Sequence, residues 1–213
     1  MNISIKHITW TKICLLLFWS YLTFLMIEIT WKYIPIQDDV SFLAIKQDEV
    51  NGILGYLPLF YVHVYSSIFV LILGLIQHFK IFPQIHRILG YAYVIILLFF
   101  AAPSGLFIGY YANGGFWAQI AFIVLGILWI FYTLRAIIRI KNKNLIGHQF
   151  DMWRSYALTL SALTLRAWKV GIVYLFQPHP LEAYILVAWL GWVLNLIIIE
   201  LYINHKLKIY EKN

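Results

Sequence analysis

The apolar stretches of this chain constrain its fold more than any other feature, because each is long enough to cross a lipid bilayer. A transmembrane helix needs about 20 mostly apolar residues to span about 30 Å of hydrocarbon. Six stretches meet this requirement, and they cover residues 10–33, 56–78, 88–111, 116–140, 152–176 and 183–204. We therefore predict an all-α integral membrane protein, a bundle of six transmembrane helices that forms a single membrane domain over residues 1–213.

The composition predicts that the lipid bilayer surrounds this protein. Hydrophobic residues make up 62% of the chain and charged residues 12%, whereas a soluble domain is typically about 45–50% apolar and about 25% charged. The net charge of +7 does not indicate nucleic-acid binding, because most of the cations flank apolar stretches instead of clustering on a polar face. The single cysteine, Cys14, excludes an intramolecular disulfide and a cysteine-based metal site.

Each break between apolar stretches has a chemical cause. Pro83 cannot continue the second stretch as a helix. The segments 113–115 (Asn-Gly-Gly) and 142–144 (Asn-Lys-Asn) are typical of turns, and Pro178 with Pro180 divides the last two stretches. These breaks support the count of six.

The charges at the ends of the stretches predict the topology, because lysine and arginine accumulate in cytoplasmic loops. Six spans place on one side the twelve basic residues Lys6, Lys12, Lys80, Arg87, Arg135, Arg139, Lys141, Lys143, Arg154, Lys206, Lys208 and Lys212. The opposite side has Lys32 and Lys46, together with the acids Asp38, Asp39, Asp48, Glu49 and Glu182. We therefore predict that both termini are cytoplasmic.

Ionisable groups within the apolar stretches are the candidates for function, because each costs from about 2.5 to more than 10 kcal/mol in hydrocarbon. In the fifth stretch, polar and small residues recur at steps of three and four: Ser155, Thr159, Ala162, Arg166 and Lys169. This spacing predicts one helix face directed at the bundle interior. Arg166 could extend toward the outer surface, pair with Glu28 or Glu182, or bind an anionic headgroup, a quinone oxygen or a haem propionate.

A ligand pocket is the first hypothesis that these residues suggest. His63 in the second stretch lies at a depth similar to that of Arg166, and Asn195 lies near the middle of the sixth. We predict a ligand-binding site made by His63, Thr159, Arg166 and Asn195. The alternatives are structural: a histidine bonded in the interior, and an asparagine that bonds to a neighbouring helix.

Histidines near the helix ends suggest a different site. His86 and His148, with or without His63, could hold a b-type haem, although histidines at helix ends are often merely solvated. His78 and His205 lie at the same level. Arg87 is expected to meet lipid phosphate, and Glu200 is expected to pair with a base such as Arg154.

The polar residues follow a pattern that resembles a bacterial family of membrane proteins of unknown function. The pattern covers about residues 57–202 and includes His63; His86, Arg87, Gly90 and Tyr93; His148; the run Arg154, Ser155, Tyr156, Ala157, Leu158 and Thr159; Thr164, Leu165 and Arg166; and Trp189, Leu190, Trp192, Asn195, Leu196 and Glu200. One departure is Asp151-Met152-Trp153, where the family has Trp followed by Met. The resemblance implies a multi-pass protein of the bacterial cytoplasmic membrane and no established activity. A weaker likeness, of fold alone, is to the cytochrome b561 type of bundle.

Three functions remain open at this point. The chain binds a small molecule or lipid near His63 and Arg166, or it is a haem b or quinone-linked redox protein, or it is an accessory or assembly subunit with a membrane-protein partner. An enzyme is not favoured, since no nucleophile is followed by a base in a recognisable pattern.

Overall fold

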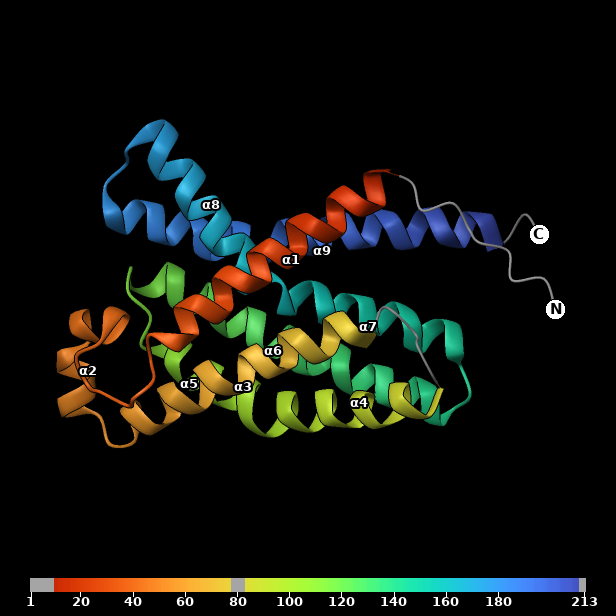
Figure 1. Ribbon diagram of the computed structural model, residues 1–213, viewed down its shortest axis with the longest axis horizontal. Helices are drawn as coiled ribbons and strands as arrows, with labels where there is room; N and C mark the ends of the chain where they lie inside the picture. Colours follow the sequence, from red (N-terminus) through yellow and green to blue (C-terminus); the bar gives the residue numbers. More distant parts are fainter. Residues whose placement is uncertain (1–9, 78–82, 211–213) are drawn as a thin grey trace.

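The computed structural model describes residues 10–77 and 83–210, and these residues form an all-helical protein without strands (Figure 1). Its elements are α1 (Trp10–Trp31), the 3₁₀ helix η1 (Ser41–Ile45), α2 (Gln47–Gly52), α3 (Tyr56–Gln77), α4 (Pro83–Ile96), the π-helical turn η2 (Leu97–Ala101), α5 (Ala102–Tyr110), α6 (Phe116–Lys141), α7 (Leu145–Thr159), α8 (Ser161–Phe176) and α9 (Pro180–Tyr210). Lys6, His78, Lys80 and Lys212 lie outside the described residues, as does the side chain of Lys12.

Four helical segments in this part of the chain are long and apolar enough to cross a membrane: Tyr56–Gln77, Pro83–Tyr110, Phe116–Lys141 and Pro180–Lys208. The pair α7 and α8 makes a fifth if the two are taken as one bent span. The first predicted stretch forms α1, in which the segment Leu17–Trp31 is a shorter apolar helix. The structure therefore accounts for four or five spans.

The helix ends occur where the turn chemistry predicts them. Gly114 and Gly115 have φ of +86° and +66°, backbone conformations that side chains rarely tolerate. Asn144 caps α7, since its Oδ1 accepts a hydrogen bond from Gly147 N at 2.8 Å. Pro180 is the first residue of α9, a position where the missing N–H costs nothing.

The central core packs between α3, α4, η2, α5, α6, α7 and α9. Its buried members are Val70, Tyr93, Leu97, Ala101, Ala102, Trp129, Tyr156, Leu158 and Trp192. Close approach of α3 and α7 depends on Gly74, because a Cβ added there would lie 2.3 Å from the ring of Tyr156. A glycine thus allows an aromatic ring to fill the space between two helices.

The fifth predicted stretch is not one continuous helix, contrary to the sequence prediction. It breaks after Thr159, and α7 and α8 meet at an angle of 42°. As a result, Ser155 and Thr159 are buried as predicted, whereas Arg166 and Lys169 on α8 are exposed. The prediction of a single interior-facing stripe is wrong, because the bend turns the second half of the stripe away from the core.

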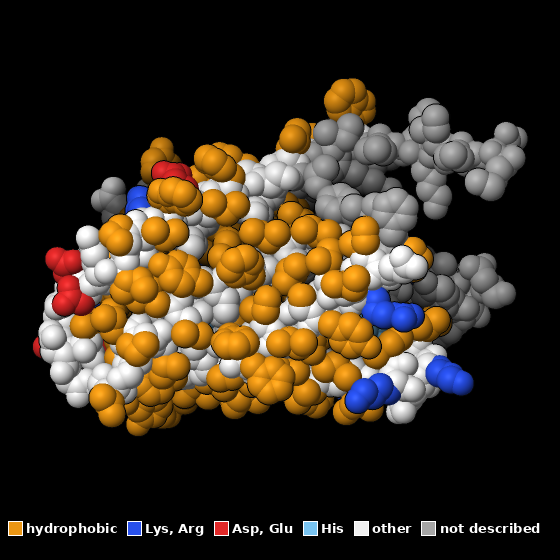
Figure 2. Space-filling model, turned by 60° about the horizontal axis from the view of Figure 1, so that its bottom comes forward, with side chains coloured by type: hydrophobic (Ala, Val, Ile, Leu, Met, Phe, Trp, Pro, Cys, Tyr) orange, Lys and Arg blue, Asp and Glu red, His pale blue; other side chains and the backbone are white. Residues whose placement is uncertain are grey.

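The two ends of the bundle differ in charge (Figure 2). Acidic side chains gather at the end formed by α2 and the loop before it, and basic side chains gather at the opposite end, where α6 turns into α7 and α9 finishes. On the face that Figure 2 shows, hydrophobic side chains cover most of the surface between them. We call these the acidic end and the basic end.

Candidate functional site

His63 on α3 is held by the π-helical turn η2. Its Nδ1 lies 2.9 Å from the Ala101 carbonyl oxygen, and a carbonyl can only accept, so Nδ1 carries the proton. Nε2 is left as the acceptor of the neutral ring, and Ser67 Oγ lies 3.5 Å from it, at the limit of a hydrogen bond. Pro103 follows the turn and lacks an N–H, which favours irregular hydrogen bonding just before it. Single π-helical turns of this kind occur frequently at functional sites.

Arg166 on α8 points back along its own helix. Its Nη1 donates to the Ala162 carbonyl oxygen at 2.7 Å, one turn nearer the start of α8. The guanidinium is therefore directed away from the acidic end. Among the described residues it forms no ion pair, and neither Glu28 nor Glu182 contacts it.

Arg166 and His63 share one region between α1, α3 and α8. The two side chains interact electrostatically, and Arg166 also interacts with Tyr33. On the side of His63 and Arg166 that is nearer the basic end, the buried residues Met26, Leu71 and Leu163 pack α1, α3 and α8 together. We call the polar region on the acidic-end side of this cluster the α1–α3–α8 site, made by Tyr33, His63, Ser67 and Arg166.

Thr159 belongs to a separate network of buried hydroxyls. Tyr93 Oη lies 2.9 Å from both Ser155 Oγ and Thr159 Oγ1, and Trp129 Nε1 donates to Thr159 Oγ1 at 3.1 Å. Thr133 Oγ1 joins the network through Ser155 Oγ at 2.8 Å. Every donor in this set has an acceptor within it or on the backbone. Thr159 therefore helps to pack α4, α6 and α7 together.

Asn195 forms hydrogen bonds at the bend between α7 and α8. Its Nδ2 donates to the Ala157 carbonyl oxygen and to Thr164 Oγ1, each at 3.0 Å. The predicted alternative of a bond to a neighbouring helix is confirmed. The structure thus brings His63 and Arg166 together, whereas the described hydrogen bonds of Thr159 and Asn195 go to other groups.

The histidines of the haem hypothesis lie on helices with different neighbours. His86 is exposed on α4, which packs mainly on α3 and η2. His148 on α7 donates through Nδ1 to the Ala136 carbonyl oxygen of α6 at 2.9 Å. Within residues 10–77 and 83–210 no group of three or more metal-binding side chains is found. Haem binding by His86 and His148 therefore stays a prediction.

A cluster of arginines around Asp151 lies at the basic end, and the sequence did not single it out. Asp151 is fully buried and pairs with Arg135, Arg139 and Arg154, which come from α6 and α7. Arg154 also pairs with Glu200 of α9, as the sequence suggested. The signal that the sequence analysis missed is the spacing of three charges. Arg135 and Arg139 are four residues apart near the end of one apolar stretch, and Asp151 follows them on the other side of the turn at 142–144. Arg87, the remaining predicted structural cation, is exposed on α4.

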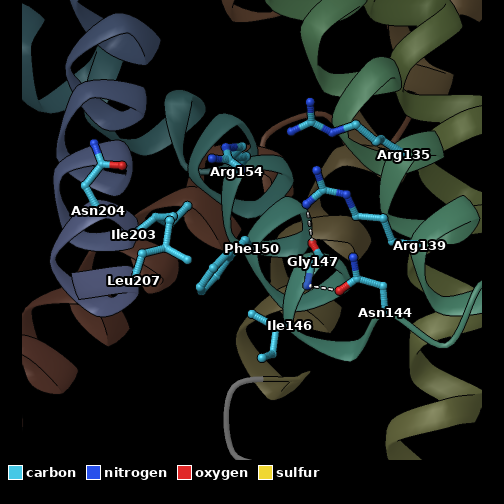
Figure 3. A pocket seen from close by; sticks show the side chains of 10 residues that line it. All are labelled: Arg135, Arg139, Asn144, Ile146, Gly147, Phe150, Arg154, Ile203, Asn204 and Leu207. Carbon is cyan, nitrogen blue, oxygen red and sulfur yellow. Dashed lines mark hydrogen bonds between the residues drawn. The ribbon is translucent and has the colours of Figure 1, made fainter. Parts of the chain in front are cut away.

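This cluster lines an open cavity of about 470 Å³ (Figure 3). Arg135 and Arg139 enter from α6, Gly147, Phe150 and Arg154 from α7, and the side chains of α9 face them. The lining residues are Arg135, Arg139, Asn144, Ile146, Gly147, Phe150, Arg154, Ile203, Asn204 and Leu207. The cavity therefore combines guanidinium groups with apolar walls.

Comparison with known proteins places this chain in a family but gives no activity. No curated protein and no solved structure matches it. One family does match, and it covers residues 60–203, which include His63, Arg166 and the whole arginine cluster. The chain therefore belongs to the family described as "Predicted membrane protein (DUF2306)", a membrane protein family of unknown function.

Proposed function

We propose that this protein crosses the bacterial cytoplasmic membrane six times and binds a lipophilic carboxylic acid at the α1–α3–α8 site. The six spans are α1, α3, the segment from α4 to α5, α6, the bent pair α7 and α8, and α9. The basic end faces the cytoplasm in this topology, with both termini on that side. The difference in charge between the two ends supports it, since basic loops stay on the cytoplasmic side (Figure 2).

The observation that carries the binding proposal is that the Arg166 guanidinium forms no ion pair among the described residues. It is turned back toward the start of α8, and its described hydrogen bond goes to a carbonyl that carries no net charge. A cation in this position is costly unless an anion accompanies it. An anionic group of a lipophilic molecule would neutralise this charge and use the remaining N–H donors.

His63 adds a second, complementary group. Its Nδ1 is committed to the Ala101 carbonyl, so Nε2 offers a lone pair within the same site. A carboxyl group matches both residues in turn, since the neutral acid that enters the site donates its hydroxyl proton to Nε2, and once it is ionised its oxygens accept from Arg166 and neutralise the guanidinium charge. A phosphodiester has only acceptors at neutral pH and cannot use Nε2 of the neutral ring in this way.

The depth of the site also favours a carboxylic acid. Arg166 lies ten residues before the end of α8, which is about 15 Å along the helix at 1.5 Å per residue. A phosphodiester headgroup remains charged and stays at the membrane interface, whereas a carboxylic acid can enter the hydrocarbon as its neutral form. The ligand class that fits is therefore a long-chain fatty acid or a similar single-chain acid.

The proposal is tested with radiolabelled oleate and the purified full-length protein in phosphatidylcholine nanodiscs. Arg166→Gln is expected to weaken oleate binding about tenfold or more, because a hydrogen-bonded charge is lost. The control is Arg87→Gln, which removes an exposed arginine on α4 and is expected to leave oleate binding unchanged. Phosphatidylglycerol is added as a competitor to separate a lipid headgroup from a free acid.

Two outcomes would contradict the proposal: unchanged oleate affinity in Arg166→Gln, or displacement of oleate by phosphatidylglycerol at equal concentration. If Arg166→Gln does not accumulate, His63→Asn provides the decisive measurement. The asparagine Nδ2 can still donate to the Ala101 carbonyl from the place of Nδ1, but the Nε2 lone pair is gone. Oleate should then bind several-fold more weakly, and unchanged affinity in His63→Asn rejects the site.

A further inference from the structure

We infer that the cavity at the basic end is a binding site for the phosphate group of an anionic phospholipid. This site is separate from the α1–α3–α8 site and does not depend on the ligand proposed there, but it rests on the proposed topology, which places the basic end at the cytoplasmic surface. Its walls come from α6, α7 and α9, and it lies at the opposite end of the bundle from α2 (Figures 1 and 3).

The first argument is the charge of the cavity. Arg135, Arg139 and Arg154 contribute three positive charges, and the carboxylates that pair with them are Asp151 and Glu200. Three cations against two anions leave one positive charge that no described ion pair neutralises. A monoanionic phosphodiester would balance it.

The second argument is the supply of unused donors. Arg135 engages Asp151 through Nε and Nη2, and Arg139 uses Nε for Asp151 and Nη1 for the Gly147 carbonyl. Arg135 Nη1 and Arg139 Nη2 have no hydrogen-bond partner in the described part of the chain. Both side chains are about one-third exposed, at 33% and 32%, so these N–H groups are open to a ligand. Paired N–H groups on rigid guanidinium planes suit phosphate oxygens.

The third argument is that the guanidinium groups are already held in place. Arg135 lies over the rings of Phe131 and Tyr132, with 5.0 Å from Cζ to each ring centroid, and Arg154 lies 5.6 Å from the centroid of Tyr132. The fully buried carboxylate of Asp151 forms an ion pair with each of the three arginines and so holds their guanidinium groups in position. A ligand would therefore lose little affinity to the ordering of these side chains.

The fourth argument concerns the rest of the wall and selects a lipid over a free phosphate ion. Ile146, Phe150, Ile203 and Leu207 line the same cavity. Apolar side chains beside arginines suit a molecule that carries acyl chains next to its phosphate. Basic pockets between transmembrane helices on the cytoplasmic side are known to receive anionic headgroups.

Calorimetric titration of the purified full-length protein in detergent tests the inference, with dioctanoyl phosphatidylglycerol as the probe. Inorganic phosphate and zwitterionic dioctanoyl phosphatidylcholine are titrated in parallel. We expect saturable binding of phosphatidylglycerol, at least tenfold tighter than that of either other probe. Arg139→Gln should weaken it about tenfold, because a charged hydrogen-bond donor is removed.

A purely structural cluster is distinguished by a variant that acts in the opposite direction. Glu200→Gln removes a partly exposed negative charge and one of the two oxygens that accept from the Nε and Nη2 donors of Arg154. It should tighten phosphatidylglycerol binding several-fold, whereas a cluster that only joins helices would show no gain. Lys32→Gln, the control, removes an exposed cation outside this cavity and should leave binding unchanged. Equal binding of phosphatidylglycerol and phosphatidylcholine, tighter binding of inorganic phosphate, or no response to either variant would overturn the inference.

Discussion

Asn195 on α9 donates a hydrogen bond to the Ala157 carbonyl oxygen at 3.0 Å, at the point where α7 ends and the chain bends into α8. In an unbroken helix this carbonyl would accept from the N–H of Ser161. The bend at Leu160 interrupts that ladder, and Asn195 supplies a donor to the carbonyl instead. The same amide donates to Thr164 Oγ1, so one side chain on α9 joins both halves of the bent pair.

Replacing Asn195 with leucine should therefore destabilise the protein. The variant leaves the Ala157 carbonyl without this donor, at a cost of about 1–2 kcal/mol, which is the range found for hydrogen bonds between transmembrane helices. The measurement is the free energy of unfolding in mixed micelles. Asn204→Leu, on an exposed position of α9, is the matched control. Equal stability of the two variants would show that the bend does not need Asn195.

The features that could be predicted from the sequence are local ones. Apolar length defined where the helices lie, and the Asn-Gly-Gly and Asn-Lys-Asn segments produced the expected turns. The bend at Leu160 could not be predicted in this way, because no proline or glycine marks it. The carbonyl at the bend is bonded by a partner on another helix, 38 residues further along the chain.

In the polar sites, too, the sequence predicted local features but not those that depend on contacts between distant residues. The sequence identified His63 and Arg166 as unusual for their surroundings, and the pairing of Arg154 with Glu200 followed from their shared level. The hydroxyl network was not predicted, because Tyr93 and Thr159 are 66 residues apart and only the packing of α4 on α7 brings them together. Asp151 was missed since its role depends on how the turn at 142–144 folds the end of α6 onto α7.

Gly74→Ala should destabilise the bundle, although alanine is the better helix former. The added methyl group would lie 2.3 Å from the Tyr156 ring, so the ring or α3 must move. Overpacking of this kind costs about 1–3 kcal/mol. Gly171→Ala on α8 is the control, because nothing lies within 4 Å of the new methyl group there. Thermal unfolding in detergent should show a lower transition temperature for Gly74→Ala and an equal or higher one for Gly171→Ala.

Asp151→Asn should be among the most damaging single substitutions. It removes the carboxylate that three arginines share and leaves their charges facing one another at the basic end. Breaking a buried ion pair from one side costs about 3–5 kcal/mol. Glu200→Gln, which affects a carboxylate that is 38% exposed, should cost much less. Comparable amounts of folded protein after solubilisation of the two variants would contradict this ranking.

The proposed topology can be measured by labelling single cysteines in intact cells. In a Cys14→Ser background, Asp48→Cys reports on α2 at the acidic end, and Lys143→Cys reports on the turn between α6 and α7 at the basic end. A membrane-impermeant maleimide should label Asp48→Cys in intact cells and Lys143→Cys only after the membrane is opened, because loops rich in lysine and arginine remain inside. Labelling of both positions from the same side would contradict the orientation. It would also remove the basis for locating the arginine cavity at the cytoplasmic surface, where anionic headgroups would meet it.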